Sequence, residues 1–135
     1  MDVRALHHVA FAVEDLEGAV ETYRRRFGAE VELHGRIEEQ GIEAVYLLMG
    51  SGRVELMTAL EPDTPVGRFL TRRGPGMHHI AYEVADVAAA VRELAAAGAQ
   101  VIEPAPRLGL AGHEVAFVHP DSLYGVLAEV VSSHG

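Results

Sequence analysis

The sequence predicts an α+β fold of two related βαβββ modules, whose strands form a curved sheet around a cleft. Three features predict it: an internal repeat, strand-like alternation of apolar residues in each copy, and polar residues at equivalent places in both copies. The chain of 135 residues is long enough for one domain that buries roughly two-thirds of its unfolded surface. We therefore expect one domain over 1–135, with modules over about 4–60 and 77–132 joined by a segment over about 61–76.

The repeat relates segments 71 positions apart. Residues 7–16, HHVAFAVEDL, return at 78–87 as HHIAYEVADV, and the same shift carries GIEAVYL at 41–47 onto GHEVAFV at 112–118. After a three-residue insertion, Glu55 falls opposite Glu129. Two copies are too few for a solenoid, so the repeat predicts a pseudo-twofold domain.

Each element of the first module has a local signal. Residues 6–13 are β-rich and are followed by Asp15, a good N-cap. Apolar residues then recur at helical spacing until Gly28, which predicts a helix over 16–27. Three further segments are expected to be strands: 29–38, 42–49 and 52–59.

The second module repeats this order after a short connection. Asp63-Thr64-Pro65 predicts a short helix through Leu70, because proline suits the first helical turn. The glycine-rich segment 72–76 then links the modules, and Asp86 and Gly98 bound a second amphipathic helix. The remaining strands of this module are expected at 99–103, 113–119 and 125–131.

Composition excludes several classes of function. The net charge of -9 argues against binding to nucleic acid, whose phosphates would be repelled. The sequence has no cysteine, so a transition-metal site must use histidine and carboxylate ligands. No targeting signature and no apolar stretch of membrane-spanning length is present. We expect a cytoplasmic protein with no membrane or nucleic-acid partner.

Two histidines occupy equivalent strand positions. Alternate side chains of a strand share a face, so His8 lies with Ala10 and Ala12, and His79 lies with Ala81. The small neighbours leave space on that face. A single strand histidine is more often structural than functional, but two at equivalent positions of a repeat favour one shared site.

Two glutamates strengthen this interpretation. Glu55 and Glu129 each stand between apolar residues of a strand, where a carboxylate costs several kcal/mol to desolvate unless it is paired or binds a metal. Two imidazoles and two carboxylates suit Co, Mn, Ni, Zn or Fe. The sequence therefore predicts a divalent metal site made by His8, Glu55, His79 and Glu129.

Several stretches carry a family resemblance along essentially the whole chain. They are HHVA at 7–10, EQG at 39–41, GRVEL at 52–56, DTPV at 63–66, GPGMHHIA at 74–81, FVHP at 117–120 and GVLAE at 125–129. Together they resemble the vicinal-oxygen-chelate superfamily (glyoxalases, bleomycin-resistance proteins and dioxygenases), and within it the methylmalonyl-CoA epimerases. Members pair two βαβββ modules and bind a divalent metal in the cleft.

The resemblance implies a reaction and roles for individual residues. The positions of His8, Glu55, His79 and Glu129 match the metal ligands of the family, and Glu129 could also act as a base. A catalytic glutamate follows Glu-Gln-Gly in some epimerases; here the nearest candidate is Glu43, although the matched position could instead be Ala44. The implied activity is epimerisation of methylmalonyl-CoA by proton abstraction, through an enolate that the metal stabilises.

Other expectations concern the partners. The substrate would be a CoA thioester, and arginines are available for its CoA part: Arg36, Arg53, Arg72, Arg73 and Arg107. Curved sheet edges that need protection predict a homodimer. The family's usual Gly-Gly is replaced by Tyr124-Gly125, so the resemblance does not determine which acyl group the substrate carries. A glyoxalase I-like lyase, another metal enzyme of the superfamily and a metal-free protein that binds a small ligand remain as alternatives.

Overall fold

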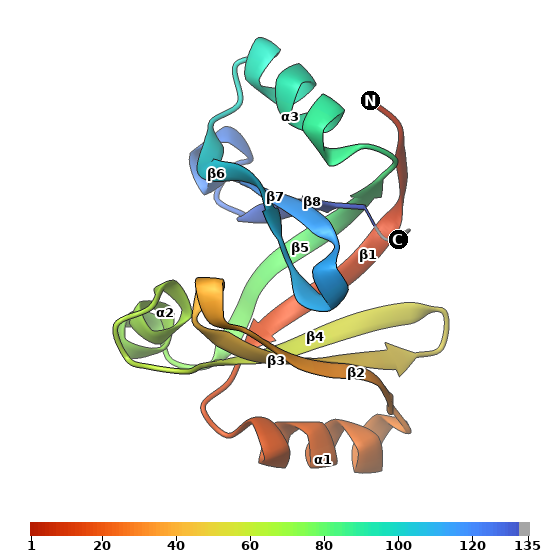
Figure 1. Cartoon of the computed structure of the whole chain (residues 1–135). Helices are drawn as coiled ribbons and strands as arrows, with labels where there is room; N and C mark the ends of the chain where they lie inside the picture. Colours follow the sequence, from red (N-terminus) through yellow and green to blue (C-terminus); the bar gives the residue numbers. More distant parts are fainter. Residues whose placement is uncertain (133–135) are drawn as a thin grey trace. The chain divides into compact units, whose positions relative to one another are not determined.

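The computed structural model describes residues 1–132 and divides into two compact units. One unit is Val9–His78, and the other combines residues 1–8 with the chain from His79 onward. The element order is strand, helix, three strands, a connecting helix, and again strand, helix, three strands (Figure 1). The predicted α+β class and the two βαβββ modules are confirmed. Among the described residues, no helix is long and apolar enough to cross a membrane.

The Val9–His78 unit contains four strands in the order β2-β3-β4-β1. Their bounds are β1 Val3–Ala12, β2 Glu30–Ile37, β3 Ile42–Met49 and β4 Gly52–Ala59. Strand β1 runs parallel to β4, whereas β2-β3 and β3-β4 are antiparallel. The three later strands are thus observed within one residue of the expected segments, whereas β1 begins three residues before the expected start at residue 6.

Helix α1 (Leu16–Phe27) covers one face of these strands (Figure 1). Asp15 caps it by accepting a hydrogen bond from the Gly18 amide at 3.0 Å, and Gly28 ends it with φ 67°. The strand residues that face the helix are apolar and buried: Val45, Leu47 and Leu56. This face of the unit is therefore packed, which leaves the other face of the same strands for function.

Helix α2 (Pro65–Arg73) follows, and its start is the one predicted. The Thr64 hydroxyl accepts a hydrogen bond from the Gly67 amide at 3.0 Å. The helix continues three residues beyond Leu70, so Arg72 and Arg73 belong to its last turn and not to the linker. Basic side chains in the last turn stabilise a helix through its dipole.

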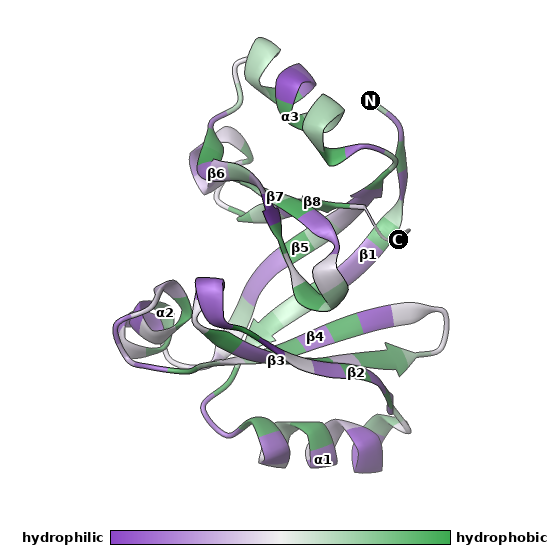
Figure 2. Ribbon diagram, viewed as in Figure 1, coloured by the Kyte–Doolittle hydropathy of each residue, from purple (hydrophilic) through white to green (hydrophobic). Residues whose placement is uncertain are grey.

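The second unit orders its strands β5-β8-β7-β6. Their bounds are β5 Gly76–Val84, β6 Val101–Leu108, β7 Glu114–Val118 and β8 Ala128–Val131. Helix α3 (Val87–Ala96) packs a buried stripe of Val87 and Ala90 on this sheet. In Figure 2, α3 is mostly hydrophobic with one hydrophilic band, whereas α1 alternates between the two colours.

Two strands of this unit differ from the prediction. Strand β6 extends through Leu108 instead of ending near residue 103, and it includes Pro104 and Pro106. Prolines are tolerated there because β6 is the last strand in the order and need not donate on its free side. Strand β8 begins at Ala128 and not at 125, because Tyr124 and Gly125 take positive φ angles of 60° and 98°.

The two modules use the same register. Ala10 of β1 lies beside Glu55 of β4, and Ala81 of β5 lies beside Glu129 of β8, in both cases across a parallel pair. Tyr46 faces Glu55 across an antiparallel pair, as Phe117 faces Glu129. The sequence repeat is therefore a structural repeat, down to the neighbours of the two buried glutamates.

Candidate metal centre

Three of the predicted ligands meet within the unit that combines residues 1–8 with the chain from His79 onward. The Nε2 atoms of His8 and His79 are 3.3 Å apart. Glu129 lies 3.6 Å from each imidazole, with Oε1 toward His8 and Oε2 toward His79. All three residues are buried, with exposed fractions of 2% to 5%. These ligand atoms lie within 4.8 Å of one another, so they surround a common centre.

The spacing fits a divalent ion. Ligand atoms bonded at about 2.1 Å to one ion, with angles of about 90° to 110°, lie about 3.0 to 3.4 Å apart. The observed separations of 3.3 Å and 3.6 Å are close to that range. Two imidazoles and one carboxylate form the donor set of Zn, Fe, Co, Ni and Mn sites with open positions for substrate. The three residues therefore fit a metal centre, as the sequence predicted for them.

His7 contacts one of the candidate ligands, His8, on the ring nitrogen that does not face the centre. Its Nδ1 lies 2.8 Å from Nδ1 of His8, and His7 itself is buried. A histidine that offers Nε2 to a metal carries its proton on Nδ1 and donates it to a neighbour, which fixes the ring and its tautomer. With Nε2 of His8 bound to an ion, His7 would be the acceptor of this hydrogen bond. The sequence analysis did not assign this role, although the doubled histidine was the available signal.

The surroundings of the centre are apolar. The Phe117 ring meets His79 edge-on, with centroids 5.4 Å apart. On the same face, Ala81, Val115 and Val131 form a buried cluster. Low polarity around the carboxylate strengthens its attraction to a cation and raises the cost of leaving it unpaired. The sheet thus provides a setting in which a bound ion would neutralise Glu129.

Glu55 belongs to the Val9–His78 unit, and its role as a fourth ligand stays a prediction. It is buried at 4% exposure and faces Tyr46 across the antiparallel pair. Two positions before it, Arg53 forms a bidentate pair with Glu32 at 2.6 and 2.9 Å and lies over the Tyr46 ring. Glu55 is on the face of β4 opposite to Val54 and Leu56, which pack toward α1.

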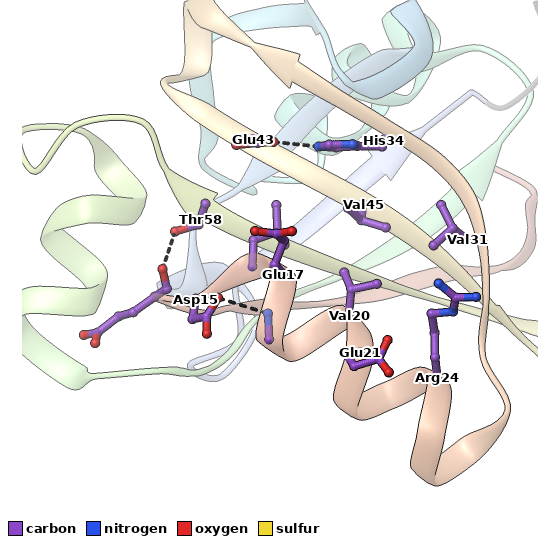
Figure 3. A pocket seen from close by; sticks show the side chains of 13 residues that line it. Asp15, Glu17, Val20, Glu21, Arg24, Val31, His34, Glu43, Val45 and Thr58 are labelled. Carbon is purple, nitrogen blue, oxygen red and sulfur yellow. Dashed lines mark hydrogen bonds and ion pairs between the residues drawn. The ribbon is translucent and has the colours of Figure 1, made fainter.

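Glu43 lies on the other face of the same unit. It shares its face of β3 with Val45, which packs with α1 residues, and it lines a surface pocket beside α1. Its carboxylate contacts the His34 ring nitrogen at 2.6 Å (Figure 3). Residue Ala44, by the strand alternation, takes the face of Glu55. The choice between Glu43 and Ala44 for the family's catalytic position is therefore also a choice between the two faces of β3. A catalytic role for Glu43, which lies on the face opposite to Glu55, stays a prediction.

His78 occupies a different environment from its repeat equivalent, His7. Its ring meets the Phe69 ring edge-on at a centroid distance of 4.9 Å. The Arg73 guanidinium lies over the same Phe69 ring, 5.5 Å from its centroid. Burial, and then the positive charge of Arg73, lower the pKa of His78 from 6.5 to about 4. His78 is therefore neutral at physiological pH.

The fold and this centre define a class of protein, and comparison with known families gives the same answer. Residues 7–117 match the family described as the glyoxalase/bleomycin resistance protein/dioxygenase superfamily. The match covers most of the chain, and the chain belongs to this superfamily. The resemblance inferred from the sequence motifs is confirmed.

Several similar proteins are methylmalonyl-CoA epimerases. The ethylmalonyl-CoA/methylmalonyl-CoA epimerase of Cereibacter sphaeroides is 38% identical over 127 residues, which span 93% of this chain and 95% of that protein. The human mitochondrial methylmalonyl-CoA epimerase is 36% identical over 126 residues, 93% of this chain and 72% of that protein. A Streptomyces coelicolor methylmalonyl-CoA epimerase variant with 2-nitronate-propionyl-CoA bound superposes with a TM-score of 0.95 at 34% identity, over 99% of this chain and 100% of that one.

Proposed function

We propose that this chain is a methylmalonyl-CoA epimerase that works with a divalent metal ion. The observation that carries the proposal is the buried group of His8, His79 and Glu129, whose ligand atoms surround one centre. Relatives that are more than 30% identical along nearly the whole chain are named as epimerases of methylmalonyl-CoA. Their names support the choice of a CoA thioester as the substrate.

The reaction exchanges a proton at the carbon between a thioester carbonyl and a carboxylate. A divalent ion held by this group would act as a Lewis acid on the substrate oxygens and would lower the cost of their growing negative charge. Glu129 presents two oxygens, one toward each histidine. With an ion bound by this group, Glu129 would both help to hold it and accept the proton from the substrate carbon, and the apolar neighbours Phe117 and Val131 would limit water around its carboxylate.

Hydrogen–deuterium exchange tests the proposal directly. Methylmalonyl-CoA incubated with the protein in deuterated water should gain deuterium at that carbon. A chelator should abolish the exchange, and Co or Mn should restore it. Retention of full exchange in Glu129→Gln, with the metal still bound, would contradict the role of Glu129 as the base.

The same assay separates the alternatives. Turnover of a glutathione hemithioacetal without exchange of methylmalonyl-CoA would favour a glyoxalase. Tight binding of a small ligand without metal and without turnover would favour a binding protein. Either result would overturn the epimerase proposal.

The finer parts of the proposal have their own tests. We propose Co as the working ion, with Mn, Ni, Zn and Fe as the other ions that the donor set suits. Elemental analysis of purified protein would identify the ion, and its loss in His79→Ala would test the ligand set. Glu55 is proposed as the fourth ligand and Glu43 as a second proton-transfer group.

Assembly and location complete the proposal. A homodimer is proposed because the edge strands β2 and β6 need protection from uncontrolled pairing. Sedimentation at micromolar concentration should show it, and a purely monomeric protein would contradict it. The cytoplasm is the proposed location, and fluorescence microscopy of a tagged chain would test it.

A further inference from the structure

Two buried polar atoms near the metal centre have no hydrogen-bond partner within the described residues 1–132. They are Nε of Arg107, on β6, and Nδ1 of His113, immediately before β7. An unsatisfied buried polar atom carries a desolvation cost that folded proteins generally avoid. Two such atoms in one unit therefore indicate a group that binds there.

Both residues lie on the face that carries the metal ligands. Arg107 is directly opposite Val115, and residues opposite each other in an antiparallel pair share a face. Val115 shares its face of β7 with Phe117, which in turn lies opposite Glu129 of β8. His113 stands two positions before Val115 in extended backbone, with ψ 143°, so its side chain takes the same face.

The two residues are held at a short distance from the centre. Strands β6, β7 and β8 are neighbours (Figure 1), so β6 is roughly 10 Å from β8. The His113 ring meets the His7 ring edge-on with centroids 6.5 Å apart, and His7 contacts the ligand His8. The loop between β6 and β7 is closed by the hydrogen bond from the Gly109 amide to the His113 carbonyl at 2.8 Å, and Leu110 anchors it as a buried residue.

Three of the other four arginines that the sequence analysis considered for the substrate already have partners, and the fourth, Arg72, is exposed in the last turn of α2. Arg53 pairs with Glu32, Arg36 contacts Glu38 at 3.4 Å, and Arg73 lies over an aromatic ring. Arg107 forms none of the ion pairs found in the described chain, and it combines a positive charge with an unpaired, buried N–H. An arginine in this state suits an oxyanion, which accepts from the guanidinium and also from an imidazole N–H.

We propose that Arg107 and His113 together bind an oxyanion of the substrate beside the metal centre. The inference rests on the proposed function, because it assumes a CoA thioester with a free carboxylate. The oxyanion is either that carboxylate or a phosphate of CoA, and the two groups share the recognition chemistry. Arg107 and His113 are positioned to select the substrate; the proton transfer remains with Glu129.

Calorimetric binding with two thioesters tests the proposal. Methylmalonyl-CoA carries both kinds of oxyanion, whereas methylmalonyl-pantetheine carries only the carboxylate. Arg107→Gln should raise the Kd for methylmalonyl-CoA about 10- to 100-fold, and His113→Phe about 3- to 10-fold. The double variant should lose less than the product of the two effects, because both residues hold one anion.

The second thioester identifies the anion. If the variants weaken methylmalonyl-pantetheine by the same factors, the carboxylate is the ligand. If they leave that compound unaffected while weakening methylmalonyl-CoA, a CoA phosphate is the ligand. Both outcomes support the oxyanion site.

The control is Arg92→Gln, which removes an equal charge from the exposed part of α3 in the same unit. Variants of Arg107 and His113 that bind both thioesters within twofold of this control would overturn the proposal. Melting curves would confirm folding, and Arg107→Lys, which keeps the charge and loses the Nε donor, replaces Arg107→Gln if that variant does not fold. Wild-type protein that binds neither thioester would instead overturn the proposed function, and the inference with it.

Discussion

The two βαβββ modules share one scaffold but differ in what surrounds their buried glutamates. In the second module, Glu129 faces Phe117, an apolar ring that also packs against the candidate ligand His79. In the first module, Glu55 faces Tyr46, whose ring lies under Arg53. The repeat therefore places the two glutamates at equivalent strand positions but surrounds them with different side chains. A duplicated fold can keep its strand registers while the neighbours of equivalent residues change.

The two glutamates give the strongest test of this difference. Glu129→Gln should lower deuterium exchange of methylmalonyl-CoA at least 100-fold, because an amide cannot take the proton. Glu55→Gln should stay within about tenfold of wild type, because an amide oxygen can still serve as a neutral ligand. Exchange rates at matched metal occupancy would measure both. Equal losses in the two variants would show that the modules share the catalytic work.

His7 and His78, which directly precede the candidate ligands His8 and His79, provide the second test. His7→Ala should weaken metal binding about 10- to 100-fold, because it removes the hydrogen-bond partner that orients His8. His78→Ala should leave metal affinity within about threefold, because that ring contacts Phe69 in the other compact unit. Competition with a fluorescent chelator would measure both affinities. A larger loss from His78→Ala than from His7→Ala would reverse the assignment.

His78 should instead affect stability at acid pH. Its pKa of about 4 lies below the unfolded value of 6.5, so between these values the unfolded chain binds the extra proton and acid favours unfolding. The free energy of unfolding should fall by roughly 1 to 2 kcal/mol between pH 6.5 and 4 on account of this residue, after allowance for its partial exposure. Denaturant titrations with a chelator present should show a smaller fall in His78→Gln. An unchanged pH profile would contradict this explanation.

The helix caps should show the two modules behaving alike. Asp15 accepts from the Gly18 amide at 3.0 Å, and Asp86 accepts from the Ala89 amide at 3.1 Å. Replacing either by alanine should cost about 1 kcal/mol of unfolding free energy, because each leaves a helix N–H without its partner. Thermal or denaturant unfolding would compare them. Costs that differ by more than about 1 kcal/mol would show that one cap has an additional role.

Much of this arrangement was already predictable from local sequence. The period of two along a strand placed His8 with Ala10 and His79 with Ala81, and the observed registers beside Glu55 and Glu129 agree with that alternation. The aspartate caps and the glycine after the first helix marked helix ends correctly. These features depend on backbone geometry over a few residues, so the local sequence was sufficient to predict them.

Tertiary structure decided what depends on neighbours across strands. A one-residue uncertainty in the sequence alignment hid the face of Glu43, which the β3 register places beside His34 and α1. The extension of β6 through two prolines required its edge position, because an inner strand would need those missing N–H donors. The unpaired atoms of Arg107 and His113 likewise appear only once the sheet is assembled, since hydrogen-bond satisfaction is a property of the folded surroundings and not of the residue type.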